Sequence, residues 1–166
     1  MHCIVIAHNI RSTYNAGAIL RSCDGFGVEA FYATGYTPYP ALQDDSRPPH
    51  VRQKLTTQIA KTALGAEQTV AIAYEDDVTR LLERYRSQGY TIVALEQSVH
   101  SISLADYVPP ERIALLLGEE VHGIPAPLLR SCDVTLEIPM HGLKESFNVS
   151  VATGIALYAL TTQTKN

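Results

Sequence analysis

Residues 113–125 read IALLLGEEVHGIP, an apolar run followed at once by a turn with a glycine at each end and then a proline. Five consecutive aliphatic residues are typical of a strand that is covered on both faces. Gly118 and Gly123 permit a tight turn, and Pro125 suits the first turn of a helix. The segment therefore predicts a β-strand that leads into a short helix, which is the repeating unit of an α/β fold.

Similar apolar or β-branched runs elsewhere predict five more strands, at residues 3–7, 30–34, 69–73, 91–95 and 134–138. Between two of them, residues 76–88 form an amphipathic helical pattern with acids at its start and Gly89 as a stop. The alternation predicts an α/β fold with a mostly parallel six-stranded sheet and helices on both faces. We expect one domain over residues 1–166.

The composition supports a folded protein that works in a reducing compartment. Hydrophobic residues make up 46% of the 166 residues and charged residues 18%, enough apolar side chains for a sizeable core. There is no basic leader and no apolar run near the roughly 20 residues of a membrane span. The three cysteines form no C-x-x-C pair and the six histidines have no metal-ligand spacing. We expect a cytoplasmic protein with no metal and no membrane partner.

The net charge of −4 is unevenly spread, because residues 1–61 have six Lys/Arg and four Asp/Glu, whereas residues 62–166 have seven and thirteen. The stretch RPPHVRQKLTTQIAK (47–61) has four basic side chains and no acid. Such a stretch is usually a solvated face, and the alternative is a contact surface for a polyanion. Its prolines predict a stiff, extended loop after the second strand. The candidates for contacts with the phosphates of a polyanion are Arg47, Arg52 and Lys54.

Three segments that follow strands carry polar side chains, and ligands in parallel sheets bind outside the carboxyl ends of strands. Each segment also has an ordinary structural explanation. Asn15 could cap a helix that begins near residue 16, with Arg21 extending to solvent. Positions 15 and 21 are roughly 120° apart on a helical wheel. If both serve one site, Asn15 does so from the loop before the helix.

The last segment leads into a closing helix from about Val149. Ser146 and Asn148 are residue types that cap helices. The helix carries a narrow stripe of apolar residues, whose ordinary meaning is core packing and whose alternative is contact with a partner chain. The stripe comprises Val149, Ala152, Ala156 and Leu160.

Taken together, three motifs in order resemble the signature motifs of the SpoU (TrmH-like) ribose 2′-O-methyltransferases of the SPOUT superfamily. They are NAGAILR (15–21), GEEVHG (118–123) and IPMHGLKESFNVSVA (138–152). The resemblance implies a C-terminal deep trefoil knot, S-adenosylmethionine as the cofactor, RNA as the substrate and a homodimer formed through the C-terminal helix. Two positions depart from the family's usual residues, Glu119 and Phe147.

The resemblance also implies the site residues. The implied catalytic residues are Asn15, Arg21, Glu120, Ser146 and Asn148. The implied cofactor contacts are Leu95, Leu117, Gly118, Ile138, Met140, Ser146 and Phe147. An arginine side chain stays protonated, with a pKa above about 12, so it is a poor base. We therefore expect Arg21 to bind the phosphate beside the target ribose and to stabilise negative charge on the 2′ oxygen, with phosphate or water accepting the proton.

Other functions remain open at this stage. A flavodoxin-like nucleotide-binding domain would share the strand-helix alternation, but the turn after the first strand lacks both glycine-rich phosphate motifs. A non-catalytic RNA-binding module of the same fold would look similar. Among RNA substrates, tRNA is favoured over rRNA.

Overall fold

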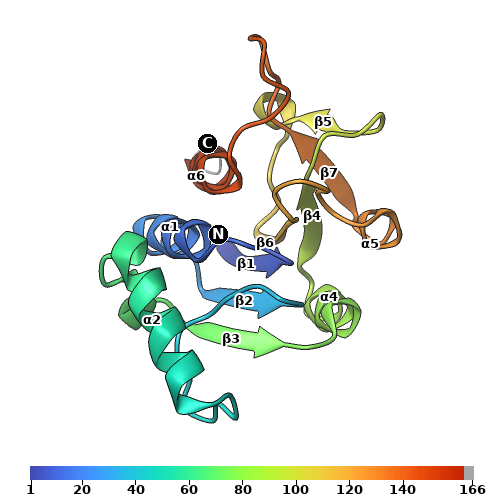
Figure 1. Cartoon of the computed structure of the whole chain (residues 1–166). Helices are drawn as coiled ribbons and strands as arrows, with labels where there is room; N and C mark the ends of the chain where they lie inside the picture. The colour runs from blue at the N-terminus through green and yellow to red at the C-terminus, as the bar shows by residue number, and fades with distance from the viewer. Residues whose placement is uncertain (163–166) are drawn as a thin grey trace.

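The computed structural model describes residues 1–162, so residues 163–166 of the predicted domain lie outside the described residues. It contains one seven-stranded sheet in which all neighbouring strands are parallel, in the order β3-β2-β1-β6-β4-β7-β5 (Figure 1). The strands are β1 (His2–His8), β2 (Ala30–Thr34), β3 (Ile72–Glu75), β4 (Thr91–Leu95), β5 (Ile102–Ser103), β6 (Arg112–Leu117) and β7 (Val134–Glu137).

The α/β prediction is confirmed, but the prediction of six strands is wrong. The seventh strand, β5, has two residues and pairs with Leu136 and Glu137 of β7 at the sheet edge. A two-residue strand is too short to produce an apolar run. The strand expected at 69–73 is shifted to Ile72–Glu75, because the residues before it form the short helix α3 (Ala66–Thr69).

Helices cover both faces of the sheet, as predicted. On one side lie α1 (Thr13–Gly25), α2 (Pro49–Ala63) and α6 (Val149–Thr162), and on the other α4 (Val78–Ser87) and α5 (Ala126–Arg130) (Figure 1). A single 3-10 turn, η1 (Leu104–Asp106), precedes β6. Neighbouring residues of β1 point to opposite cores: Val5 packs with α1, and Ile4 packs with α4. Doubly covered strands explain the continuous apolar runs of the sequence.

The basic stretch 47–61 is mostly helix, so the prediction of an extended loop there is wrong. Pro49 is the first residue of α2, where its missing N–H has no helical partner to lose and its fixed φ suits the helix. The helix packs closely on α1: a side chain on Gly17 would come within 2.4 Å of the Ile59 carbonyl oxygen. Thr62 Oγ1 also donates to the Tyr14 carbonyl oxygen at 2.9 Å.

The strand order brings four loops to one edge of the sheet. β1, β6, β4 and β7 are consecutive neighbours and run in the same direction. The loops that follow them therefore meet at their carboxyl ends, although they are far apart in sequence. No helix among residues 1–162 is long and apolar enough to cross a membrane.

Candidate active site

A cavity of about 300 Å³ opens at the carboxyl ends of β4, β6 and β7. The residues predicted to contact the cofactor lie in its wall with one exception; those in the wall are Leu95, Leu117, Gly118, Ile138, Ser146 and Phe147. Met140 is half-buried and is not part of the wall. The strands supply apolar side chains to this cavity, and the loops supply backbone and carboxylate groups.

Glu96 fixes one wall of the cavity, and sequence reasoning missed it. Its carboxylate accepts the Ile124 N–H at 2.9 Å and the Gln97 N–H at 2.9 Å, which ties the loop after β4 to the loop after β6. Gly123 has φ +68°, and a side chain there would overlap this carboxylate. A side chain on Gly118 would collide with the backbone of Gly123, so close packing of the loop itself requires glycine. The available signal was an acid directly after the strand at 91–95.

Three polar residues from distant segments form one hydrogen-bonded chain beside the cavity. Asn15 Nδ2 donates to Glu120 Oε1 at 2.8 Å, and Asn148 Nδ2 donates to Asn15 Oδ1 at 3.2 Å. A carboxylate only accepts, so Glu120 sets the orientation of the Asn15 amide, which in turn sets that of Asn148. The structure thus brings together one predicted residue from each of the three motifs.

Backbone donors hold Glu120 in place. The N–H groups of Arg11 and Ser12 donate to its two carboxylate oxygens at 2.9 and 3.2 Å. Burial opposes ionisation, but these N–H groups and the Asn15 amide outweigh it and lower the pKa of Glu120 below its ordinary value. Glu120 is therefore an ionised acceptor at neutral pH and does not supply a proton.

Asn15 is the third residue of α1, and the prediction that it caps the helix from the preceding loop is wrong. The cap is Ser12, whose Oγ accepts the Asn15 N–H at 3.2 Å. Asn148 does cap its helix as predicted: its Oδ1 accepts the Ser150 N–H at 2.9 Å at the start of α6. Ser146 is exposed in the cavity wall.

Glu119 forms a second, separate cluster at the cavity. Its side chain is 8% exposed and accepts hydrogen bonds from the His122 N–H at 3.1 Å and from the ring, with the Arg11 guanidinium at 3.5 Å. Burial raises the pKa of Glu119, yet the His122 contacts dominate and lower it. This departure from the family's usual residue therefore has local partners of its own.

Arg21 does not join the polar chain. It lies on α1 in the wall of a different surface concavity, with Leu64 and Gln68, and makes no hydrogen bond or ion pair with any residue of the range 1–162. Asn15 and Arg21 both lie on α1, and as predicted they point in different directions from it. A substrate that contacts both must span the surface between them, or a second chain must complete the site.

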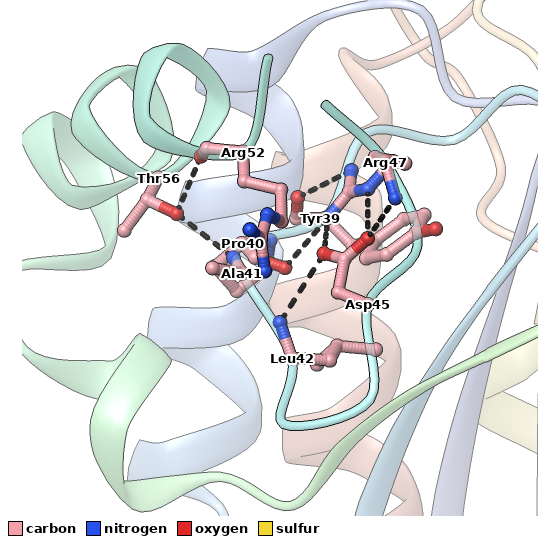
Figure 2. Close-up of polar contacts among 8 residues, drawn as sticks. All are labelled: Tyr39, Pro40, Ala41, Leu42, Asp45, Arg47, Arg52 and Thr56. Carbon is pink, nitrogen blue, oxygen red and sulfur yellow. Dashed lines mark hydrogen bonds and ion pairs between the residues drawn. The ribbon is translucent and has the colours of Figure 1, made fainter. Parts of the chain in front are cut away.

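Arg47 is held inside its own loop (Figure 2). Its guanidinium donates to both carboxylate oxygens of Asp45 and to the carbonyl oxygens of Tyr39 and Pro40, at 2.5–3.1 Å. The same group lies 3.5 Å from the centroid of the Tyr39 ring. Because these partners use its donors, Arg47 is not a free phosphate ligand. This counts against one of the four residues predicted to bind RNA. Of the other three, Arg21 lies on α1, and Arg52 and Lys54 lie on α2, where Lys54 is exposed.

The predicted apolar stripe of the last helix faces the core. Ala156 and Leu160 are buried beneath α6, whereas Val151, Ile155 and Tyr158 are exposed on its other side at helical spacing. The core explanation therefore holds for Val149, Ala156 and Leu160, whereas Ala152 is half-buried in the cavity wall. An arginine at Ala156 would disrupt the core, so any partner chain must use the outer side.

Metal and thiol chemistry have no candidates among the described residues. No group of three or more His, Cys, Asp or Glu side chains within residues 1–162 is arranged to hold a metal ion. Burial raises the pKa of Cys3 to about 12 and that of Cys132 to about 11, so both remain thiols at neutral pH.

Solved structures share this fold. An AdoMet-bound rRNA methyltransferase from Sinorhizobium meliloti superposes with a TM-score of 0.81 at 22% identity, over 99% of this chain and 57% of that one, which supports the fold alone. A TrmH/SpoU tRNA modifying enzyme from A. aeolicus gives a TM-score of 0.79 at 28% identity, over 97% of this chain and 74% of that one.

Relatives found by sequence comparison are named as RNA 2′-O-methyltransferases. A tRNA (guanosine(18)-2′-O)-methyltransferase from Aquifex aeolicus is 32% identical over 93% of this chain and 66% of its own length. A 23S rRNA (guanosine-2′-O-)-methyltransferase from Vibrio vulnificus is 30% identical over 93% of this chain and 57% of its length. The chain thus spans less than two thirds of these relatives. A sequence model of the SpoU rRNA Methylase family matches residues 2–158, and the chain belongs to that family.

Proposed function

We propose that this protein transfers a methyl group from S-adenosylmethionine to a ribose 2′-hydroxyl of RNA. The observation that carries the proposal is the chain from Glu120 through Asn15 to Asn148, which joins the three motif segments at the mouth of one cavity. A simple nucleotide-binding module has no need of such a chain. The protein's relatives named as 2′-O-methyltransferases support the same reaction.

The cavity suits the cofactor. Leu95, Leu117 and Ile138 offer apolar walls for an adenosine, and Glu119 and Glu120 line the same cavity with carboxylates that would favour a cationic sulfonium. S-adenosylmethionine supplies an electrophilic methyl group, so the reaction requires no metal. We also propose that the loops around this cavity form the deep trefoil knot. The proposal is supported by the contact of Gly123 with Glu96, which packs the loop after β6 against the loop after β4.

The protein's residues would position the reactants, since none of the polar chain is a free base. Glu120 is an ionised acceptor whose oxygens are already bonded to N–H groups. Arg21 is free to bind the phosphate beside the target ribose and to stabilise charge on the 2′ oxygen. Phosphate or water would take the proton. Ser146 and Phe147 would shape the end of the cavity that holds the reacting methyl group.

We propose tRNA as the favoured substrate, with rRNA as the alternative. The Aquifex aeolicus relative, named as a tRNA enzyme, matches at 32% identity, and the Vibrio vulnificus relative, named as an rRNA enzyme, at 30%. A cytoplasmic location would give access to either RNA. A non-catalytic RNA-binding protein would bind the same RNA without transferring methyl groups.

We propose that the protein forms a homodimer through the outer side of α6. Val151, Ile155 and Tyr158 are 50%, 37% and 62% exposed there and form one apolar patch. A partner seated on this patch would also lie near α1, which packs on α6 and carries Arg21. Ile155→Arg should give a monomer in light scattering, while Ile155→Val keeps the dimer. An unchanged dimer in the arginine variant would remove α6 as the interface.

The reaction is tested by incubating the protein with radiolabelled S-adenosylmethionine and unmodified total tRNA or rRNA. Digestion to nucleosides should place the label in 2′-O-methyl nucleosides, with more label from tRNA. Label in a base would contradict ribose as the acceptor. RNA binding without any transfer would favour the non-catalytic alternative.

A further inference from the structure

Leu64 is in a backbone conformation that its side chain disfavours. It ends α2 with φ +52° and ψ +41°, in the left-handed region, with its N–H donating to the Ala60 carbonyl oxygen at 3.0 Å. Glycine or asparagine is the usual residue there, because a β-carbon crowds the following carbonyl. A branched apolar residue at positive φ is an outlier that calls for an explanation.

Packing does not supply that explanation. The Leu64 residue is 64% exposed and belongs to neither apolar core of the described residues. An isolated exposed leucine is ordinary. The strained backbone of Leu64 lowers the stability of the fold, and burial of its side chain does not offset this loss.

Leu64 shares an open concavity of about 450 Å³ with Arg21 and Gln68. The two helices that border it, α1 and α2, pack tightly on each other, because Gly17 lies directly against Thr62 and Thr62 donates to the Tyr14 carbonyl oxygen. Arg21 contributes a guanidinium with no partner in the described chain, and Gln68 contributes an exposed amide. An apolar side chain, an amide and a cation in one concavity match the base and phosphate of a nucleotide.

A carboxylate limits what the concavity can hold. Asp24 lies in its wall and accepts a hydrogen bond from Thr69 Oγ1 at 2.5 Å. This negative charge would repel a run of phosphates, whereas Arg21 can still hold one. The charge arrangement therefore favours a single nucleotide over a general polyanion surface.

We infer that this concavity binds one nucleotide of the substrate RNA beside the target, with its base or ribose packed on Leu64 and its phosphate held by Arg21. The inference rests on the proposed function. It explains why a leucine is kept where glycine would be more stable, since strain retained at a functional site is offset by what the residue binds.

The experiment compares Leu64→Asn and Leu64→Gly with Leu64→Met. Asn and Gly relieve the backbone strain, so the melting temperature should rise by about 2 °C. Both substitutions also remove the apolar contact with the nucleotide. The Kd for unmodified tRNA should weaken roughly 10-fold, because the apolar contact of Leu64 with the nucleotide is lost. Leu64→Met should bind tRNA within about threefold of wild type. Cofactor affinity should be unchanged in all three.

Val108→Asn is the matched control. Val108 is 84% exposed, lies before β6 and is not part of the concavity wall, so its substitution should leave tRNA binding unchanged. The inference falls if Leu64→Asn binds tRNA like wild type or loses stability. It also falls if that variant dissociates a dimer, which would make the concavity a contact with a second copy.

The experiment distinguishes failure of the nucleotide site from failure of the proposed methyltransferase function. Wild-type protein that methylates RNA while Leu64→Asn binds and reacts normally would overturn only the nucleotide site. Wild-type protein that neither binds nor methylates tRNA or rRNA would overturn both.

Discussion

Two arginines that the sequence assigns to RNA have opposite surroundings. Arg47 has a side chain that is 18% exposed and donates to a carboxylate that is 2% exposed and to two carbonyl oxygens. Arg21 is exposed and has no partner in the described residues. The difference shows that a basic residue is available to a substrate only if its own loop leaves its donors unused. In this protein the loop of Arg47 uses them and the helix of Arg21 does not.

The largest expected effect is on stability, from Arg47→Ala. Removing the guanidinium leaves the buried Asp45 carboxylate without its strongest partner, which should cost about 2–4 kcal/mol of unfolding free energy. Arg21→Ala should stay within about 0.5 kcal/mol, because nothing in the described fold depends on it. Urea denaturation measures both. Equal losses would erase the contrast between the two arginines.

The pH dependence of stability checks the same pair. Hydrogen bonds from Arg47 hold the pKa of Asp45 well below its usual range despite burial. A carboxyl with a lowered folded-state pKa adds stability above its unfolded pKa of about 3.9 and loses it as pH falls further. Wild-type stability should therefore decline more between about pH 5 and pH 2 than that of Arg47→Ala. Parallel curves would contradict the assigned pair.

Glu120→Gln should have a smaller effect on stability, about 1–3 kcal/mol. The carboxylate accepts three N–H groups, and an amide offers one acceptor oxygen and places an NH₂ against the remaining donors. Methyl transfer should fall as well, since Asn15 and Asn148 lose their fixed orientation. Thr57→Ala, an exposed change on α2, serves as the control. Full activity in Glu120→Gln would remove the polar chain from the mechanism.

The smallest expected effect is on RNA affinity, from the remaining basic residues of α2. Each phosphate contact contributes about −0.7 to the slope of log K against log salt for a single strand. Replacing Arg52 and Lys54 with Ala should flatten the slope by up to about 1.4. Adding Arg47→Ala, in protein that is still folded, should not flatten it further. A further change would mean that Arg47 leaves Asp45 to bind RNA.

The sequence was sufficient for features that depend on side-chain pattern. Apolar runs located β2 and β4 to the residue, and the motif resemblance named Asn15, Glu120 and Asn148, which the fold brings together. Contacts made by backbone groups cannot be predicted in this way, because they leave no pattern in the sequence. The N–H groups of Arg11 and Ser12 that hold Glu120 exist in any residue but proline.

Other errors have the same origin. The prolines after β2 predict an extended segment, yet Pro49 starts α2, since proline favours a first helical turn as readily as a loop. The two-residue strand β5 is defined by pairing and not by composition. The positive φ of Leu64 follows from how α2 ends, and nothing in a leucine predicts it.

The central claim is that Arg21 acts on the RNA and has no part in holding the cofactor. Its most direct test is single-turnover methyl transfer to tRNA alongside calorimetric titration of S-adenosylmethionine, for wild type, Arg21→Ala and Arg21→Lys. A point charge cannot replace a planar, bidentate guanidinium, so both variants should lose turnover to a similar extent while cofactor affinity stays unchanged. Near-normal turnover in Arg21→Lys, or weakened cofactor binding in either variant, would contradict the claim.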